Sequence, residues 1–514
     1  MIENKQSNPL NMYYSKSVLF FSILLLITLT AKADIISVRP EGVPESRDYK
    51  VWVDDQEVFT GQAGDDHHGL YSFCTFDFTG SIKVRIRSLR AVKWLDIMPS
   101  GLEIDYRTMD DFTFEFVLEE PKMITVLVNN DKSNALHLLT SRPETKKPDP
   151  SDENILFYKG GKVYDIGVLD LKDNQTLYIE GGAVLKGMVR IKDAKNVRIL
   201  GRGMIDGSEN ESSGNDPSGN QKWRLIYMLN SENLKIEGIT LFNSLRWTIH
   251  AHACTGMELN NIRVINWDYG SDGTDLSACQ DVKILNSFYR TNDDPIVIKA
   301  LSFDENSYYP NPPVKNPDVK NILVEGCALW NMPYGNVLEI GFELRCDRVS
   351  DITFRDCDVL MSDHRGAVFG IHNSDYAIVE DVLFENIRVE NADLVNGHKL
   401  FDIAILYSMW SYDKFEDPEM IRKYRYNDAW DNLLPVLPGK EAFHAQFRGH
   451  VRNIHFKDIQ ILDGKLPYSV INGFDEDHLV EKIVFENISI QGRNLTNKKE
   501  LKLYTKYAKD ITIK

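Results

Sequence analysis

The sequence is short of positive charge. Its 514 residues contain 59 lysines and arginines against 76 aspartates and glutamates, which gives a formal net charge of −17 at pH 7. A surface with this excess of negative charge disfavours nucleic acids and anionic membranes as partners. It also weakly disfavours a polyanionic substrate, although a local basic cleft would override that effect.

Long hydrophobic runs are scarce as well. The run Val18–Leu29 follows Lys16 and leads to the small-residue motif A-K-A that ends at Ala33. It is too short for a comfortable transmembrane span, and its flanks are typical of a secretory signal peptide, with a membrane anchor as the less favoured alternative. We therefore expect cleavage near Ala33, removal of residues 1–33, and a secreted or periplasmic protein. The loss of three lysines and one glutamate makes the mature net charge −19. No cysteine immediately follows the cleavage site, so nothing indicates a lipid-anchored form.

The length of the chain exceeds what one hydrophobic core usually supports, so two domains are expected. Residues 34–140 contain short alternating segments, such as YKVWVDDQEVF and FTFEFVLEE, which are typical of antiparallel strands separated by turns. They predict a small β-sandwich. The proline-rich, charged stretch 141–154 has the composition of a linker. We place the sandwich at residues 34–150 and a second domain at 151–514.

A nine-residue phrase recurs in the second domain, for example as LKIEGITLF at 234–242 and IVFENISIQ at 483–491. In each copy the third residue is apolar, and the residue two places later tolerates a positive φ angle. The apolar residues are Ile236, Leu259, Ile284, Val324, Phe354, Phe384, Phe456 and Phe485, and the turn residues are Gly238, Asn261, Asn286, Gly326, Asp356, Asn386, Asp458 and Asn487. This self-similarity predicts an all-β solenoid, a parallel β-helix, with the apolar residues stacked inside it and loops inserted at the longer steps.

Four cysteines follow the same register. Cys254 and Cys279 each lie five residues before an apolar position, and Cys327 and Cys357 each lie three after one. These positions predict a ladder of small buried side chains rather than disulfides. Disulfides remain the alternative, because a secreted protein meets oxidising conditions.

Acidic residues gather one coil apart. Asp272 and Asp275 lie in SDGTD, and Asp293 and Asp294 lie in NDD, with 22 residues between Asp272 and Asp294. Stacked coils lie about 4.8 Å apart, so three carboxyl groups should crowd on one face. Crowded carboxylates repel one another, and one keeps a proton near neutral pH, as a general acid requires. Solvated turn residues are the alternative, but the shared face favours catalysis.

The phrases GRGMIDGS (201–208), SDGTDLS (271–277) and NDD (292–294) resemble those of the polygalacturonase and dextranase clan, glycoside hydrolase families 28 and 49. The sandwich and the segment after it are more similar to the dextranase branch. The resemblance implies a right-handed parallel β-helix and inverting hydrolysis, with no cofactor and no metal. It also implies that Asp293 is the general acid and that Asp272 and Asp294 activate water.

Two phrases depart from the family pattern. Where polygalacturonases have Gly-His-Gly, this chain has PYGNVLEIG, with Tyr334 and Asn336 in place of the histidine. Where they have Arg-Ile-Lys to hold the uronate carboxylate, this chain has HRGAVFGIH, with Arg365 and no following lysine in register. These departures put galacturonan as the substrate in doubt.

Coil stacking adds further candidates around the acids. Trp247 and His250 fall on the coil before Asp272, and Lys299 and Glu339 fall after Asp294. His250 is equally well explained as a buried hydrogen-bonded histidine, Lys299 as a neutraliser of the acids, and Trp247 as a packing residue. The candidate substrate-binding residues are Trp247, His250, Asp275, Lys299, Tyr334, Asn336, Glu339, Arg365, His372 and Trp410.

The longest step between repeats contains an insertion at residues 406–447 (Leu406–Phe447). It is rich in tyrosine and tryptophan and has a helix-like middle around Pro418–Arg425. Long insertions in compact domains are usually functional or disordered, and this one has too many aromatics for disorder. We expect a lid beside the acids, with Trp410, Tyr412 or Trp430 stacking on sugar, and an ordinary packing excursion as the alternative.

Together these features predict a secreted, metal-independent inverting glycoside hydrolase that acts on a polysaccharide or oligosaccharide. A polygalacturonase proper is one alternative. A polysaccharide lyase would need an arginine or lysine base and usually a calcium site, which these acids lack. A non-catalytic carbohydrate-binding solenoid would not need crowded acids. The sequence leaves the glycan, the linkage, endo or exo action and the oligomeric state open.

Overall fold

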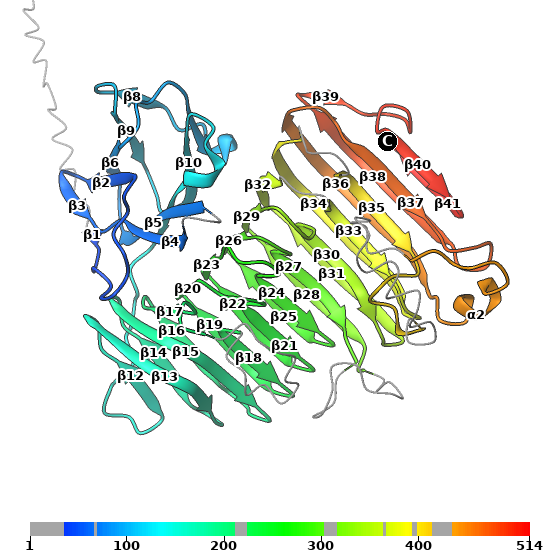
Figure 1. Cartoon of the computed structure of the whole chain (residues 1–514), viewed down its shortest axis with the longest axis horizontal. Helices are drawn as coiled ribbons and strands as arrows, with labels where there is room; N and C mark the ends of the chain where they lie inside the picture. Colours follow the sequence, from blue (N-terminus) through cyan, green and yellow to red (C-terminus); the bar gives the residue numbers. More distant parts are fainter. Residues whose placement is uncertain are drawn as a thin grey trace, which may run out of the picture. The chain divides into compact units, whose positions relative to one another are not determined.

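The computed structural model describes residues 35–65, 69–210, 224–302, 316–362, 366–392, 398–413 and 434–514 (Figure 1). The chain from Ala33 to Lys514 forms one compact unit. The expected signal peptide lies outside the described residues, and its cleavage stays a prediction. The helix-like middle of the insertion and Trp430 also lie outside the described residues, in the gap 414–433, and what we expect of them stays a prediction.

Two small sheets form the N-terminal part and pack their apolar faces together, with Val51, Val84 and Phe114 of one sheet against Phe76 and Ile124 of the other. The six-stranded sheet contains β1 (Ile35–Ile36), β4 (Gly61–Asp65), β5 (Gly69–Phe78), β7 (Leu95–Met98), β10 (Met123–Val128) and β11 (Leu136–Ser141). The five-stranded sheet contains β2 (Tyr49–Val53), β3 (Gln56–Val58), β6 (Ile82–Ser88), β8 (Tyr106–Thr108) and β9 (Thr113–Leu118). Short 3-10 turns lie at Ser100–Leu102 and Lys132–Asn134.

A 30-stranded sheet follows, and its strands stack in three parallel lines. The first line contains β12 (Ile155–Tyr158), β14 (Thr176–Ile179), β16 (Arg198–Gly201), β19 (Glu232–Glu237), β22 (Thr255–Asn260), β25 (Gln280–Leu285), β28 (Val319–Glu325), β31 (Arg348–Arg355), β34 (Ile378–Asn391), β36 (His450–Asp463), β38 (Val480–Ile490) and β41 (Ala508–Ile513). The second line contains β17 (Met204–Asp206), β20 (Thr240–Phe242), β23 (Arg263–Ile265), β26 (Phe288–Thr291), β29 (Ala328–Asn331) and β32 (Asp358–Ser362), and β39 (Arg493–Asn494) pairs antiparallel to β38.

The third line carries several of the site residues expected from the sequence, among them Asp275, Lys299 and Glu339. It contains β13 (Lys162–Leu171), β15 (Ala183–Lys192), β18 (Ile226–Leu229), β21 (Ile249–His252), β24 (Thr274–Ser277), β27 (Ile296–Ala300), β30 (Leu338–Leu344), β33 (Ala367–Asn373), β35 (Lys399–Ile405), β37 (Tyr468–Asn472) and β40 (Leu503–Lys506). One short helix, α2 (Glu441–Ala445), lies before β36 in the described part of the insertion. The predicted fold class, an all-β chain with a right-handed parallel β-helix behind a small β-sandwich, is confirmed.

The repeated phrases form the first line of strands as predicted. Each of the eight apolar residues pairs in register with the next, from Ile236 with Leu259 to Phe456 with Phe485, and all are buried. All eight turn residues have φ between 46° and 81°. The left-handed residue turns the chain at the same place in each of these coils, so the segment after it starts in the same register. Phe354 and Phe384 consequently stack with ring centroids 4.8 Å apart.

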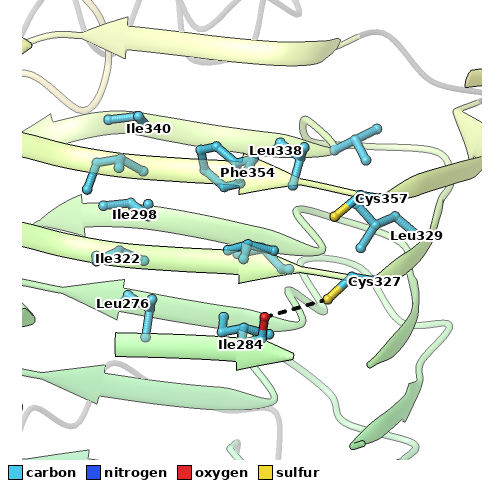
Figure 2. Packing of buried hydrophobic residues seen from close by; sticks show 14 of the residues in the cluster. Leu276, Ile284, Ile298, Ile322, Cys327, Leu329, Leu338, Ile340, Phe354 and Cys357 are labelled. Carbon is cyan, nitrogen blue, oxygen red and sulfur yellow. Dashed lines mark hydrogen bonds between the residues drawn. The ribbon is translucent and has the colours of Figure 1, made fainter. Parts of the chain in front are cut away.

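Five cysteines pack in the core of the solenoid, and Cys74 packs in the core of the sandwich. All six in the chain are buried free thiols, which confirms packing over disulfides. In Figure 2, Cys327 and Cys357 occupy successive coils, and the Cys327 thiol lies 4.0 Å from the carbonyl oxygen of Ile284. Small apolar groups fill this narrow corner, where the chain turns from the first line of strands to the second.

The sandwich packs against the second line of strands. Phe73 lies 5.9 Å from Phe242, and His137 lies 4.9 Å from Phe288, measured between ring centroids. Burial lowers the pKa of His137 to about 3, so its ring contacts the apolar neighbours in the neutral form. The second line is thus covered, and the third line is left to present functional side chains.

Candidate active site

Side chains alternate along the third line between the core and the outer face. Leu276, Ile298 and Ile340 point into the core. The opposite positions carry polar groups, and Asp275 pairs in register with His250 of the preceding coil and Val297 of the next. The register then continues to Glu339, Gly370 and Asp402. We call the outer face of β21, β24, β27, β30, β33 and β35 the floor.

The acidic residues lie at the turns that lead into the floor strands. Asp272 precedes β24, and Asp293 and Asp294 lie in the turn between β26 and β27. The backbone N–H of Gly273 donates a hydrogen bond of 2.8 Å to the carbonyl oxygen of Asp294, so the two turns are hydrogen-bonded neighbours. Asp272 and Asp294 are buried, and Asp293 is partly exposed. The predicted crowding of the acids is therefore present, and we call these residues, together with Asp275, the acid cluster.

Hydrogen bonds fix the turn that carries Asp293. The carbonyl oxygen of Asp293 accepts bonds from Thr291 Oγ1 at 2.6 Å and Asn331 Nδ2 at 2.7 Å. The Oδ1 atom of Asp294 accepts the backbone N–H of Asn336 at 2.5 Å. The turn is held from both neighbouring coils, and this leaves the Asp293 carboxyl in a defined position beside Asp294.

Burial and mutual repulsion raise the pKa values across the acid cluster. Burial, followed by the charge of Asp294, raises the pKa of Asp293 to about 8. Burial raises the pKa of Asp275 to about 7. Burial, followed by the charge of Asp275, raises the pKa of Asp272 well above its ordinary value, and burial raises the pKa of Asp294 as well. Because the carboxyl groups interact strongly, their protons are released by the cluster as a unit. The cluster holds at least one proton near neutral pH.

Lys299 neutralises one side of the acid cluster. Its Nζ atom lies 3.2 Å from Asp275 Oδ1 and 3.7 Å from Asp272 Oδ2, and 4.4 Å from the centre of the Trp247 ring. Burial would lower the pKa of Lys299, but the carboxylates of Asp275 and Asp272 raise it well above its ordinary value. The ammonium group therefore stays charged and favours the ionised forms of Asp272 and Asp275.

A second group of charges lies further along the floor. His372 Nδ1 lies 2.8 Å from Glu339 Oε1, His372 Nε2 lies 3.1 Å from Asp402 Oδ2, and Lys399 lies 2.6 Å from Asp402. Burial would lower the pKa of His372, but Glu339 and Asp402 raise it to about 10. Burial raises the pKa of Glu339 to about 7. We call Glu339, His372, Asp402 and Lys399 the histidine cluster.

Tyr334, Gly335 and Asn336 form a loop over the acid cluster. Gly335 has φ of 74°, and a Cβ atom placed on it would lie 2.4 Å from Asp293 Oδ1 and from Asp294 Oδ1. Only glycine therefore fits at this position without moving the carboxyl groups. Asn336 Oδ1 accepts the backbone N–H of Ala367 at 2.7 Å, so Asn336 links three coils. Tyr334 is partly exposed beside it.

The remaining predicted site residues lie in different surroundings. His250 has no exposed surface and packs between Tyr227 and Trp247, with ring centroids 5.3 and 4.8 Å away. The backbone carbonyl of Trp410 accepts a hydrogen bond of 2.7 Å from Arg345. Arg365 lies outside the described residues.

Sequence reasoning missed four residues near these groups. Asp402 and Lys399 belong to the histidine cluster, and Tyr269 and Arg246 lie at the turn whose Gly270 faces Asp293. Tyr269 packs against Tyr334 with ring centroids 4.2 Å apart and a tilt of 44°. The signal for Tyr269 was its place in the turn directly before the SDGTD phrase, where any side chain lies close to the acids.

Comparisons with known proteins concern the family and the fold of this chain. Residues 170–397 match the model of the family described as glycosyl hydrolases family 28. The structure of Dex49A from Penicillium minioluteum shares the fold at 13% sequence identity, with a TM-score of 0.62, and the match covers 93% of this chain and 96% of that chain. The family match and the shared fold support the polygalacturonase and dextranase clan of glycoside hydrolases for this chain.

Two further structures similar to this glycoside hydrolase have TM-scores too low to support an argument. A hyperthermoactive exopolygalacturonase from Thermotoga maritima is 18% identical, with a TM-score of 0.42, and the match covers 70% of this chain and 83% of that chain. A polygalacturonase from Erwinia carotovora ssp. carotovora is 15% identical, with a TM-score of 0.43, and covers 68% and 86%. No curated protein sequence matches the hydrolase.

The described residues also bear on membranes and metal ions as partners. In the described parts of the hydrolase, no helix combines the length and apolar character that crossing a bilayer requires. The same residues contain no group of three or more histidine, cysteine, aspartate or glutamate side chains that could hold a metal ion. Independence of metals and cofactors stays a prediction for this enzyme.

Proposed function

We propose that this glycoside hydrolase cleaves a polysaccharide with inversion of configuration, with Asp293 as the general acid and Asp272 and Asp294 as the residues that activate water. The observation that supports the proposal most directly is the raised pKa of Asp293, about 8, beside a carboxyl group that Asn336 holds in place. A carboxylic acid that stays protonated at neutral pH can donate its proton to a leaving oxygen.

The position of Lys299 and the exposure of Asp293 favour Asp293 as the member of the acid cluster that delivers the shared proton to a substrate. The ammonium group contacts Asp272 and Asp275, so those carboxylates are favoured in their ionised form. Asp294 accepts a backbone N–H through Oδ1, which also favours its ionised form. Asp293 takes part in no described ion pair with Lys299, and it is the partly exposed member of the group, so it can reach a substrate.

The reaction then follows from these roles. Asp293 transfers its proton to the glycosidic oxygen while the bond from that oxygen to the anomeric carbon breaks. A water molecule attacks the anomeric carbon from the opposite face and loses a proton to the pair Asp272 and Asp294. The new hydroxyl group has the inverted configuration. Inverting enzymes need roughly 6.5–9.5 Å between the acid and the base carboxyl groups to admit this water.

The charges on the floor favour a sugar without a carboxylate over galacturonan. Lys299 is paired with Asp272 and Asp275, and His372 and Lys399 are paired within the histidine cluster. Among the described floor residues, each of these cations is already matched by a carboxylate, so a uronate would meet uncompensated negative charge. Polygalacturonan hydrolysis remains the second candidate because residues 170–397 match family 28.

A panel of soluble polysaccharides tests the proposal: dextran, mixed-linkage glucan, mannan, arabinan and polygalacturonate. We expect reducing sugar to be released from at least one neutral member and little from polygalacturonate. NMR of the first product formed should show the inverted anomer. Retention of configuration would overturn the assignment of Asp272 and Asp294, and release from polygalacturonate alone would overturn the neutral substrate.

A further inference from the structure

Two tyrosines meet over the turn that carries Asp293. Tyr269 lies in the turn between β23 and β24, and Tyr334 lies in the loop between β29 and β30, so they come from the coils on either side of the β26–β27 turn. Backbones two coils apart lie about 10 Å from each other. The ring centroids are nevertheless only 4.2 Å apart, with a tilt of 44°. The side chains therefore lean toward each other across the intervening turn.

Each tyrosine is followed by a glycine that lies against Asp293. A Cβ atom built on Gly270, which has φ of 66°, would lie 3.8 Å from Asp293 Oδ2, and one built on Gly335 would lie 2.4 Å from Asp293 Oδ1. The two glycines thus lie beside different oxygens of the same carboxyl group. Each tyrosine is thus adjacent in sequence to a glycine that lies next to the carboxyl group of Asp293, the proposed proton donor.

Arg246 holds the backbone of this turn. Its Nη1 atom donates a hydrogen bond to the carbonyl oxygen of Tyr269 and lies 3.5 Å from the position of a Cβ atom on Gly270. The side chain of Tyr269 nevertheless remains 52% exposed, in contrast to the buried acids beneath it. An aromatic ring that is fixed at its backbone and open on one side loses little conformational freedom when it binds a ligand.

We propose that Tyr269, supported by Tyr334, is a stacking platform for the sugar ring next to the cleaved bond. The inference rests on the proposed function, because it takes Asp293 as the group that meets the glycosidic oxygen. Pyranose rings present a face of C–H groups that packs on an aromatic face, and Tyr brings a hydroxyl group that can hydrogen-bond to the sugar at the edge. No other residue at this turn offers an exposed ring beside the proton donor in the described structure.

The platform predicts a loss of binding without a loss of chemistry. Tyr269→Ala should raise KM about three- to tenfold on the polysaccharide that the wild-type enzyme hydrolyses best, because one aromatic contact is removed. The kcat and its pH profile should stay within twofold, since the ring contacts ground state and transition state alike. Tyr269→Phe keeps the ring and should restore most of the affinity. A ring that only packs against Tyr334 to position Asp293 would instead change kcat and the pH profile.

Tyr504→Ala is a matched control. Tyr504 is 60% exposed in β40 and also pairs with another tyrosine, Tyr468, with ring centroids 5.5 Å apart. It lies at the end of the solenoid, many coils from Asp293. Its removal should leave KM unchanged.

Affinity electrophoresis in gels that contain each of the five polysaccharides separates this inference from the proposed function. We expect at least one gel to retard the wild-type protein and Tyr504→Ala, and to retard Tyr269→Ala less. Equal retardation of Tyr269→Ala and wild type, or no retardation of the wild type in any gel, would overturn the platform. A hydrolysis product with retained configuration would overturn the proposed function and leave the gel result to decide the platform.

Discussion

The floor carries two charged groups that differ in how their charges are balanced. In the acid cluster four carboxyl groups share one ammonium group, Lys299, and burial with mutual repulsion raises their pKa values. In the histidine cluster Glu339 and Asp402 flank His372, and Lys399 adds a second positive charge. The first group is poised to exchange protons, whereas the second holds its charges in fixed pairs. We infer that the first serves chemistry and the second serves the stability and shape of the floor.

Among these variants, Asp293→Asn should have the largest effect on activity. A small effect would contradict the assignment of chemistry to the acid cluster. We expect kcat on the natural polysaccharide to fall by about 10²–10⁴-fold, because the proton donor is lost. An activated aryl glycoside, which needs little protonation of its leaving group, should lose much less, provided that it binds. Steady-state kinetics on both substrates check this. Near-normal activity on the polysaccharide would show that Asp293 is not the acid.

His372→Ala should act on stability instead. Its removal leaves Glu339 and Asp402 buried without their shared cation, which costs about 3–5 kcal/mol of unfolding free energy. Denaturant unfolding at pH 7 measures the loss. The loss should shrink below pH 5, where the remaining carboxyl groups take up protons. A change of less than about 1 kcal/mol would mean that the histidine cluster is not a structural unit.

The pH dependence of stability sharpens the comparison further. Burial raises the folded-state pKa of Asp293 from 3.8 to about 8, so the wild-type protein should lose stability as pH rises from about 4 to 8. In Asp293→Asn that slope should be smaller, because one titrating group and its repulsion of Asp294 are gone. For His372, whose pKa is raised to about 10, the contribution is complete below about pH 6.5 and is lost as pH rises through 10. Tm measured from pH 5 to 10 for the wild type, Asp293→Asn and His372→Ala separates the two slopes.

The alkaline limb of activity follows from the same pKa. The kcat/KM value should decline above about pH 8, where Asp293 loses the proton that it must donate. The measurement is a pH–rate profile on the best polysaccharide of the panel. Lys299→Met should move this limb to higher pH, because removal of the ammonium group raises the pKa values of the cluster. A limb that stays in place would separate Lys299 from the titrating group.

Lys399→Met should have the smallest effect. Lys399 is partly exposed, and Asp402 keeps its contact with His372 when the lysine is removed. We expect a loss of less than about 1 kcal/mol in unfolding free energy and unchanged kcat. A loss as large as that of His372→Ala would show that the lysine, and not the histidine, balances the carboxylates.

The fold could be predicted because its signal repeats. A left-handed turn residue two places after an inward apolar residue marks each coil, and one register explains all eight copies. The first coils escaped the pattern because their turns are built differently: Leu177 stacks in the same line, but the residue two places later is Ile179, which continues the strand.

The site could be predicted only where coils have constant length. Asp272 and Asp294 are 22 residues apart, so their neighbourhood follows from counting along the sequence. His372 and Asp402 belong to consecutive coils with a loop between them, and the count no longer gives their register. The contact between Tyr269 and Tyr334 depends on the lean of two side chains, which no spacing encodes.

The stacked phenylalanines show how the substrate specificity of such an enzyme could change without a change in its core. Between Phe384 and Phe456 the chain makes an excursion of 72 residues, yet the two rings still stack at 4.8 Å, as closely as Phe354 and Phe384 do. Each strand pairs with the strands of the adjacent coils, so added loops do not disturb the strands below them. Grafting of foreign loops between the strands should therefore alter which glycans are accepted while the carboxyl groups of the acid cluster stay where the backbone has placed them.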